Sequence, residues 1–416
     1  MMVIGVPREV LTGERRVALI PERVAHLVKQ GQKLLVESGA GSEAHFDDAA
    51  YVQAGAQVVP DPQVLYASSD LVVKVRAPAV NPDNGVDELA LLHAGVLLVA
   101  LLEPRVSPQR IGALAERGVT SFSLDTMPRT TRAQSMDVLS SMATVSGYRA
   151  ALLGATRLGR FFPLLMTAAG TVTPAKVLVL GAGVAGLQAI ATARRLGAVV
   201  QAFDTRPAVR EQVESLGAAF LTLPLQVEQA QDEGGYARQL EEAAYAAERE
   251  LLLEPVQGAD VIITTAAIPG AKAPILITEE MVASMRAGSV IIDLSAAMGG
   301  NCACTVLGEQ VMAHGVTIDG PVNLPATMPV HASQLFSRNL CNFVEHLLAN
   351  GLKSGASDGA FAPNLEDEIT RETCITHEGQ IVHRLTREQW EAMNGAGTSF
   401  LNRAIVGAAV GEKGVY

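Results

Sequence analysis

The sequence lacks an apolar run long enough to cross a bilayer. Its densest apolar segment, residues 89–102, contains His93 and is shorter than the ~18 residues that a membrane-spanning helix needs. A secretory signal is also missing, because Arg8, Glu9 and Glu14 interrupt the first residues. We therefore expect a cytoplasmic protein without direct membrane insertion.

Positive charge and cysteine are both scarce. The chain has 32 Lys and Arg against 43 Asp and Glu, for a net charge of −11, which argues against a nucleic-acid or anionic-membrane partner. Its four cysteines, Cys302, Cys304, Cys341 and Cys374, follow neither a zinc-finger nor a redox-pair spacing. Because the cytoplasm keeps thiols reduced, we expect free thiols and no metal site.

The most informative segment that is present, residues 177–204, reads VLVLGAGVAGLQAIATARRLGAVVQAFD. Branched apolar residues predict a buried parallel strand, followed by glycines at GxGxxG spacing, a helix and a second strand. The first glycine allows a tight turn, the second lets the backbone approach a pyrophosphate, and the third lets the helix pack on the strand. The helix N-terminus then offers free N–H groups to the phosphates. The turn residues assigned to a dinucleotide are Gly181, Ala182, Gly183, Val184 and Gly186.

Asp204 ends the second strand, where its carboxylate would accept hydrogen bonds from both ribose hydroxyls and repel a 2′-phosphate. This favours NAD over NADP. A nearby arginine can hold a 2′-phosphate, but Asp204 precedes Arg206, so we interpret Arg206 as a solvated or adenine-stacking side chain. We assign Thr205, between them, to the same site. An ordinary packed strand-to-helix turn is the alternative, and it does not account for all these features falling at the expected places.

The length of 416 residues allows two substantial cores. Strands and helices alternate both before and after a helical pattern that runs from about Ser135 into Leu164 and is rich in small residues. We predict an α/β fold with two Rossmann-like, doubly wound parallel-sheet domains joined by long helices. A helix from Leu335 is long enough to return to the first domain and make it discontinuous. The predicted domains are 1–134 with 327–384, then 135–326, with a tail at 385–416 of unknown role.

Two further local signals concern strands. CITHEGQIVH, residues 374–383, predicts a hairpin that turns at Glu378 and Gly379. GVTIDG, residues 315–320, predicts the last strand of the second domain.

Four segments together resemble one family: VPREVLTGERRVALIP, RTTRAQSMDVLSSMATVSGYRA, GAGVAGLQAIATARRLGAVVQAFDTRP, and ITTAAIPGAKAPILIT with VIIDLSAAMGGNC. They are similar to the NAD(H)-binding α1 subunit, or domain I, of proton-translocating nicotinamide nucleotide transhydrogenase, which is related to alanine dehydrogenase. The resemblance covers residues 3–384, and RAQSMD and GGYA are specific to the transhydrogenase branch.

This resemblance implies an activity, a cofactor and partners. The family's domain I is a homodimer that binds NADH and passes a hydride, with Si-to-Re specificity, to NADP⁺ on a separate β-subunit domain. The transfer is coupled to proton translocation through a membrane subunit. By this resemblance the chain is cytoplasmic, peripheral to the inner membrane through its partner subunits, and inactive in hydride exchange without them.

The resemblance also assigns site residues. Arg129, Gln134 and Asp137 match the catalytic loop that holds the nicotinamide end, and Ser140 matches the helix start that follows. From the residues alone, the alternative is an interdomain turn capped by polar side chains, with Asp137 an ordinary first-turn acid. The same loop contributes the cofactor-binding residues Thr130, Thr131 and Arg132.

Two more positions complete the assignment. Gly235 and Tyr236 match a mobile loop that closes over bound nucleotide, although GGY by itself indicates only a flexible turn. Thr265 and Ala266 end a central strand and match positions that line the nucleotide crevice.

The chain departs from alanine dehydrogenases at their catalytic pair. Their substrate-binding arginine and lysine are matched by Arg16 and Lys74, but their catalytic histidine and aspartate fall at Leu102 and Ala297. Oxidising an amino acid moves a proton as well as a hydride and needs a positioned acid or base, whereas exchange between two nicotinamides moves only the hydride. The missing pair favours transhydrogenation and leaves Arg16 and Lys74 as remnants.

Alternatives remain at the level of the sequence. His45, His93 and His331 are possible acid–base groups, but nothing places two of them together, so each is interpreted as a packed or surface residue. A freestanding alanine dehydrogenase-like enzyme is the second hypothesis. A non-catalytic NAD-binding regulator, whose tail after residue 385 recruits another molecule, is the third.

Overall fold

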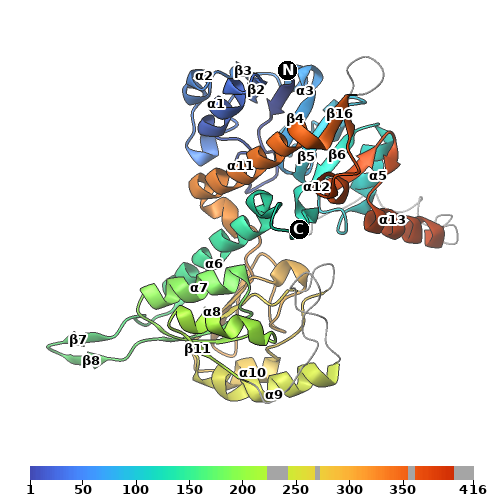
Figure 1. Cartoon of the computed structure of the whole chain (residues 1–416). Coiled ribbons are helices and arrows are strands. Elements are labelled where there is room, and N and C mark those ends of the chain that lie inside the picture. Colours follow the sequence, from blue (N-terminus) through green and yellow to red (C-terminus); the bar gives the residue numbers. More distant parts are fainter. Residues whose placement is uncertain (223–241, 268–271, 355–360, 398–416) are drawn as a thin grey trace. The chain divides into compact units, whose positions relative to one another are not determined.

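The computed structural model describes residues 1–222, 242–267, 272–354 and 361–397 (Figure 1). They form two compact units. The first contains Met1–Met142 and the described residues from Ala326 onward, and the second contains Ala143–Pro325. Both units are built from a mostly parallel sheet and its helices, so the predicted α/β class with two Rossmann-like domains is confirmed.

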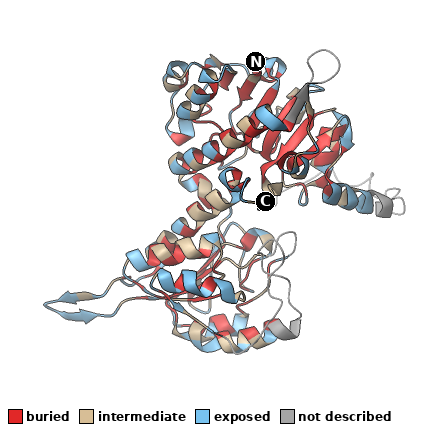
Figure 2. Ribbon diagram, viewed as in Figure 1, coloured by how far each residue is buried: buried red, intermediate tan, exposed pale blue. Residues whose placement is uncertain are grey.

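The first unit contains an eight-stranded sheet in the order β19-β18-β6-β5-β4-β1-β2-β3. The six strands from β6 to β3 pair in parallel, and β18 and β19 add an antiparallel hairpin at one edge. β5 is buried along its whole length, as expected for a strand covered on both faces (Figure 2). The bounds are β1 (Val3–Val6), β2 (Lys33–Glu37), β3 (Gln57–Val59), β4 (Leu71–Arg76), β5 (Leu97–Leu101), β6 (Thr120–Ser123), β18 (Cys374–His377) and β19 (Gln380–Ile381).

Several helices of this unit begin with a proline or an aspartate cap. Pro21 lies at the start of α1, and Asp47, Asp61 and Asp367 accept hydrogen bonds from N–H groups in the first turns of α2, α3 and α12. The bounds are α1 (Pro21–Lys29), α2 (Asp48–Gln53), α3 (Pro62–Ser68), α4 (Glu88–Leu91), α5 (Pro108–Glu116), α11 (Pro329–His346), α12 (Glu368–Thr373) and α13 (Arg384–Gly397). A small ribbon, β16 (Leu352–Ser354) with β17 (Phe361–Pro363), precedes α12.

Two local features of this unit depend on single residues. The predicted turn at Glu378 and Gly379 is confirmed, because both have positive φ, 47° and 77°, between the antiparallel strands β18 and β19. Residues 385–397, from the segment without a predicted role, belong to the helix α13, and Trp390 of this helix packs on α5. A Cβ at Gly112 would lie 2.3 Å from the Trp390 ring, so only glycine fits there.

The second unit contains a seven-stranded sheet in the order β11-β10-β9-β12-β13-β15-β14. All neighbours pair in parallel except β14 with β15. The predicted strand in residues 315–320 is present as β15. The bounds are β9 (Lys176–Leu180), β10 (Val199–Phe203), β11 (Ala219–Phe220), β12 (Val261–Thr264), β13 (Val290–Asp293), β14 (Gln310–Ala313), β15 (Val316–Asp319), α7 (Val184–Arg195), α8 (Arg210–Ser215), α9 (Glu242–Gly258) and α10 (Glu279–Ser284).

The helix expected from about Ser135 into Leu164 is shorter than predicted. α6 (Val138–Arg157) ends before Gly159, and the following residues form the two-stranded ribbon β7 (Leu165–Thr167) and β8 (Gly170–Val172). Pro163 disfavours helical backbone at Phe162, so the helix cannot continue through Leu164. Small residues let α6 pack closely in the second unit: a Cβ at Gly147 would lie 2.0 Å from the Ala185 carbonyl oxygen.

Nowhere in the described parts of the chain does a helix combine the length and apolar character that crossing a bilayer requires.

Candidate functional site: a dinucleotide-binding turn

The glycine-rich turn joins β9 to α7 in the second unit, as the fingerprint predicted. Gly181 has a φ of 96°, and a Cβ there would lie 2.7 Å from Thr265 Oγ1. A Cβ at Gly186 would lie 1.9 Å from the Gly181 carbonyl oxygen. These two glycines are therefore required by the packing of the turn itself.

Gly183 is different, because the nearest atom to a Cβ built there is an Arg206 nitrogen at 4.0 Å. Its φ of −74° suits any residue. The space in front of it is where a bound pyrophosphate would approach the backbone. Gly183 is also the N-cap of α7, which has no side-chain cap among the described residues, so its first N–H groups remain available to an anion. The turn therefore fits a dinucleotide.

Asp204 lies at the end of β10 and is held by the same turn. Its Oδ2 accepts a hydrogen bond from the Ala182 N–H at 2.7 Å. Arg206 donates to both carboxylate oxygens, from Nε to Oδ1 and from Nη2 to Oδ2, at 2.9 Å each. The hydrogen bonds that Arg206 donates to Asp204 raise the pKa of Arg206 above its usual value. The interpretation of Arg206 as a solvated side chain is wrong, because it is 16% exposed and ion-paired.

This ion pair changes how the site would select its cofactor. Each Asp204 oxygen already accepts two hydrogen bonds from N–H groups of Ala182 and Arg206, so a ribose hydroxyl would have to displace one of these donors to bind the carboxylate. The guanidinium is occupied in the plane of the carboxylate and is restrained from turning toward a 2′-phosphate. Stacking of the Arg206 face on adenine stays a prediction.

Thr265 and Ala266 follow β12 and contact the glycine turn. The Thr265 hydroxyl donates to the Gly181 carbonyl oxygen at 2.9 Å, so it ties the turn to the central strand. The Ala266 N–H donates to Asn301 Oδ1 at 3.0 Å, and Asn301 Nδ2 donates back to the Ala266 carbonyl oxygen at 2.9 Å. The Thr265 side chain therefore holds the glycine turn in place. Its contact with a nucleotide stays a prediction.

Two buried polar residues that hold this edge of the sheet were missed as site residues by sequence reasoning. Asn301 clamps Ala266 in both directions. Asp293, fully buried, accepts from the Asn301 and Cys302 N–H groups at 2.8 and 3.1 Å. Both lie inside the VIIDLSAAMGGNC segment, so the signal was present, but no spacing rule links residues 266 and 301.

A further missed residue is Glu248 on α9. It is 2% exposed, and its Oε2 has no hydrogen-bond partner within the part of the chain that the structure describes. Burial, with a further contribution from the negative charge of Asp204, raises the pKa of Glu248 to about 7. Glu248 is therefore able to exist in its protonated, hydrogen-bond-donating form near neutral pH. No motif in the charged segment that contains Glu248 predicts this role.

The loop predicted to hold the nicotinamide end lies in the first unit. Gln134 begins a short 3-10 helix, η3 (Gln134–Met136), and its exposed side chain has no hydrogen-bond partner among the described residues. The loop is anchored at the next residue, because the Ser135 carbonyl oxygen accepts from Asn339 and Asn342 of α11 at 2.8 and 2.9 Å. This anchoring fixes the backbone that carries Gln134.

The neighbours of Gln134 in this loop differ in their surroundings. Arg129 and Thr131 are exposed, and Arg132 pairs with Asp367 of the same unit at 3.0 Å. The hydroxyl of Thr130 is buried without a partner among the described residues, an arrangement that a ligand would satisfy.

Asp137 caps the start of α6. Its two oxygens accept from the Ser140 backbone N–H and hydroxyl at 2.9 and 2.6 Å. This is the geometry that the alternative interpretation of a first-turn acid describes. A role at the nicotinamide stays a prediction for Asp137 and Ser140. Gly235 and Tyr236 lie outside the described residues.

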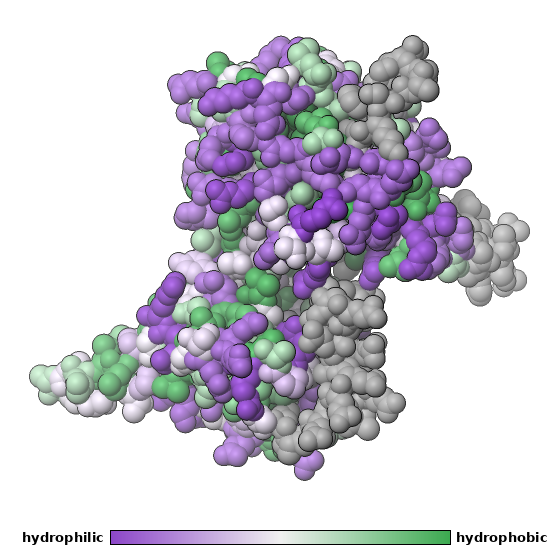
Figure 3. All heavy atoms as spheres, in the orientation of Figure 1, coloured by the Kyte–Doolittle hydropathy of each residue, from purple (hydrophilic) through white to green (hydrophobic). Residues whose placement is uncertain are grey.

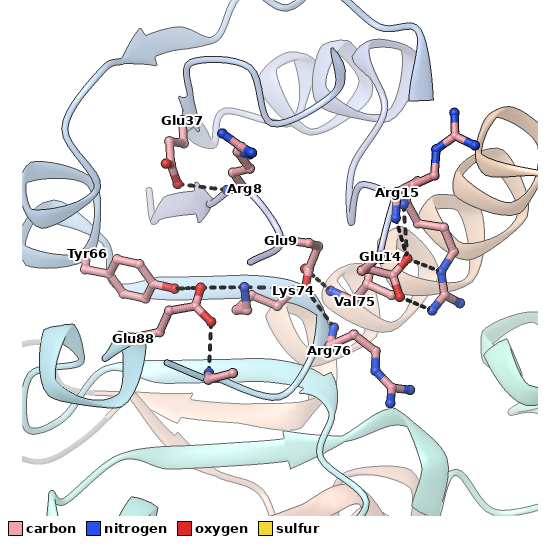
Figure 4. Close-up of polar contacts among 12 residues, drawn as sticks. Arg8, Glu9, Glu14, Arg15, Glu37, Tyr66, Lys74, Val75, Arg76 and Glu88 are labelled. Carbon is pink, nitrogen blue, oxygen red and sulfur yellow. Dashed lines mark hydrogen bonds and ion pairs between the residues drawn. The ribbon is translucent and has the colours of Figure 1, made fainter. Parts of the chain in front are cut away.

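Arg16 and Lys74 are buried and paired with glutamates, and Figure 4 shows Lys74 beside Glu88 and Glu9. Lys74 Nζ donates to Glu88 Oε1 at 2.6 Å and lies 3.5 Å from Glu9 Oε2. Arg16 donates to both oxygens of Glu14 at 2.7 and 2.6 Å. These carboxylates neutralise the two cations from within the protein.

Leu102 and Ala297 occupy the positions where alanine dehydrogenases carry their catalytic pair. Leu102 follows β5 and is fully buried, while Ala297 lies in the short 3-10 helix η5 (Ala296–Met298) and is exposed. Neither offers a proton donor or acceptor on its side chain.

The two sheets, the glycine turn at the end of β9 and the acid at the end of β10 define the class of two-domain α/β proteins that bind a nicotinamide dinucleotide. More narrowly, the chain belongs to the alanine dehydrogenase/PNT family: the model of its N-terminal domain matches residues 5–146 and that of its C-terminal domain residues 150–384. The resemblance inferred from the sequence is confirmed.

Relatives from both branches match most of the chain. It is 45% identical over 383 residues to an NAD(P) transhydrogenase subunit alpha chain of Rhodospirillum rubrum, covering 92% of this chain and 98% of that one. It is 31% identical over 342 residues to alanine dehydrogenase of Bacillus subtilis, covering 79% and 81%. The crystal structure of transhydrogenase from Sinorhizobium meliloti matches with a TM-score of 0.78 and 38% identity, over 92% of this chain and 99% of that one.

Proposed function

We propose that this chain is the NAD(H)-binding component of a proton-translocating transhydrogenase. It binds NADH and passes a hydride to NADP⁺ on a partner β subunit, and the membrane subunit of the complex couples this transfer to proton translocation. The observation that carries the proposal is the absence of proton-handling side chains at Leu102 and Ala297 in a chain that keeps an intact dinucleotide turn. The 45% identity to a transhydrogenase alpha subunit, against 31% to an alanine dehydrogenase, supports it.

The residues of this chain would bind and orient the cofactor. The first N–H groups of α7 hold the pyrophosphate, and Asp204 accepts from the ribose hydroxyls. Gln134, Arg129 and Asp137 hold the nicotinamide carboxamide and fix the ring's orientation. When bound, NADH supplies the hydride. Transfer between two rings moves no proton, so the protein needs only to keep the rings at near-attack distance.

The buried glutamates around Arg16 and Lys74 favour the same function. An amino-acid or 2-oxo-acid substrate would need these two cations free to bind its carboxylate. Glu14, Glu9 and Glu88 already satisfy them within hydrogen-bonding or ion-pairing distance. A small carboxylate would have to displace buried, paired charges, which costs several kcal/mol.

We also propose that the protein is a homodimer that uses the β7–β8 ribbon as a contact. The two strands form a sheet of their own and extend from the second unit (Figure 1). Met166 is 80% exposed and Leu164 53% exposed, and apolar atoms follow the ribbon (Figure 3). An isolated two-stranded ribbon is marginally stable in water, so a second copy that covers these side chains would stabilise it.

We propose that the chain associates with the membrane only peripherally, through its partner subunits.

The discriminating experiment measures hydride exchange with and without a partner. The purified chain is mixed with NADPH, an NAD⁺ analogue whose reduced form absorbs at a distinct wavelength, and a β-subunit NADP(H) domain. We expect turnover only when that domain is present. In parallel, the chain alone is incubated with NAD⁺ and a panel of amino acids, and we expect no reduction.

The outcomes separate the three hypotheses. Turnover with alanine alone would establish the dehydrogenase and reject the proposal. Tight NADH binding without exchange in the presence of an active β domain would favour a non-catalytic regulator.

A further inference from the structure

The helices α1 and α11 of the first unit bring three metal-binding side chains together. His26 Nε2, Cys341 Sγ and a Glu345 carboxylate oxygen all lie within 4.8 Å of one another. His26 Nε2 and Glu345 Oε1 are 2.5 Å apart. Among the described residues, this is the one group of three or more His, Cys, Asp or Glu side chains with such spacing.

The arrangement follows from helical spacing on two packed helices. Cys341 and Glu345 are four residues apart on α11, so both project from the same face. His26 and Gln30 are likewise four residues apart at the end of α1, and the Gln30 amide nitrogen lies 3.1 Å from His26 Nε2. The two pairs face each other although more than three hundred residues of chain separate them, so no sequence motif announces the cluster.

We propose that His26, Cys341 and Glu345 form a Zn²⁺ site. Imidazole nitrogen, thiolate sulfur and carboxylate oxygen are the three zinc ligands of proteins, and their summed charge of −2 balances the cation. Rotating the Gln30 amide by 180° places its oxygen toward the cluster and supplies a fourth donor. Zinc ligands lie about 3.3–3.6 Å apart in a tetrahedral site, so His26 and Glu345 need to separate by about 1 Å.

The cluster is open to solvent at His26 and Glu345. The His26 and Glu345 side chains are 44% and 30% exposed, so both can adjust, while Cys341 is 1% exposed beneath them. Burial, with the nearby Glu345 charge, raises the pKa of Cys341 to about 12, and Arg23 partly counteracts this shift. Arg23 is itself paired with Glu22, which offsets its repulsion of a cation.

Binding must therefore displace the Cys341 proton. Zn²⁺ coordinates thiolate, so its apparent affinity rises with pH. At pH 6 we expect weaker binding than at pH 8, because the cation competes with protons for the Cys341 sulfur.

The test uses the purified full-length chain. Competition with a chromophoric chelator measures Zn²⁺ affinity and stoichiometry, and Co²⁺ replaces zinc to report sulfur ligation through a near-ultraviolet thiolate-to-cobalt charge-transfer band. We expect one ion per chain and a cobalt band. Cys341→Ala should abolish the band and weaken Zn²⁺ binding by at least about tenfold, and His26→Gln should weaken binding by at least about tenfold.

The matched control is His314→Gln. His314 Nε2 lies 3.1 Å from a Glu279 carboxylate oxygen at an exposed position outside the three-ligand group, so the substitution should leave zinc binding unchanged. Circular dichroism confirms that each variant is folded, and His26 is exposed enough that its substitution should not disturb the core. A wild-type chain without the cobalt band, or equal zinc affinity in wild type and folded His26→Gln, would overturn the assignment.

Discussion

Gln134 lies in the loop that we assign to the nicotinamide end of the bound cofactor. Its side chain is exposed and without a partner among the described residues, while Asn339 and Asn342 anchor the adjacent backbone. Gln134→Ala should change the dissociation constant of NADH by less than about threefold and lower the hydride-exchange rate by about tenfold or more, because alignment is lost. Calorimetry and single-turnover kinetics measure the two quantities. Ser135→Ala, which keeps the anchoring carbonyl oxygen of the same loop, is the control for a general disturbance, and an unchanged rate in Gln134→Ala would remove Gln134 from the site.

Asp204 is expected to control cofactor choice through Arg206. Asp204→Ala should weaken NADH binding by about tenfold to a hundredfold, since it loses charge-assisted hydrogen bonds to the ribose. It also releases the Arg206 guanidinium from its two hydrogen bonds, so NADPH binding should strengthen relative to NADH. Calorimetric titration with both nucleotides measures the ratio.

The paired variant Asp204→Asn keeps the shape and one acceptor oxygen. It should retain more NADH affinity than Asp204→Ala, with Arg206 held less tightly than in the wild type. Identical nucleotide preference in all three proteins would contradict the ribose assignment.

The β7–β8 ribbon is the element on which self-association depends in our proposal. Met166→Asp places a charge on its most exposed apolar position and should convert a dimer into a monomer, because a charge buried at an interface is unpaired. Sedimentation velocity measures the mass. Met312 of β14 is 73% exposed, and Met312→Asp serves as a control that should leave the dimer intact. A monomeric wild type, or a dimer that survives Met166→Asp, would reject this role for the ribbon.

At the scale of the whole molecule, stability depends on pH through the buried cluster around Lys74. Burial raises the pKa of Glu9 from 4.5 to about 7, although the Lys74 charge acts in the opposite direction. The folded state therefore binds the Glu9 proton more tightly than the unfolded state. The free energy of unfolding should fall by up to about 3 kcal/mol as pH rises from 4.5 through 7.

Glu9→Gln should flatten this dependence between pH 5 and pH 7.5. The chain has a single tryptophan, Trp390, which packs on α5, so its fluorescence in urea reports the unfolding of the first unit alone. Glu43→Gln, at an exposed glutamate of the same unit, should keep the wild-type slope. If Glu9→Gln and the wild type lose stability in parallel, Glu9 does not carry the effect.

Sequence by itself determined the features that depend on local chemistry. The α/β class, the glycine turn between β9 and α7, the acid at the end of β10 and the turn at Glu378 and Gly379 follow from apolar periodicity and from residues that permit special backbone angles. The absence of an acid–base pair at Leu102 and Ala297 followed from the sequence only through its resemblance to alanine dehydrogenases.

Only the tertiary structure decided which distant side chains meet. The hydrogen bond from Ala182 to Asp204, the Asn301 clamp on Ala266, and the approach of His26 to Cys341 depend on strand order and helix packing. The same holds for the glutamates around Lys74, which share no period or motif. The physical reason is that hydrophobic periodicity specifies which face of an element is buried, whereas a polar contact also requires the register between elements.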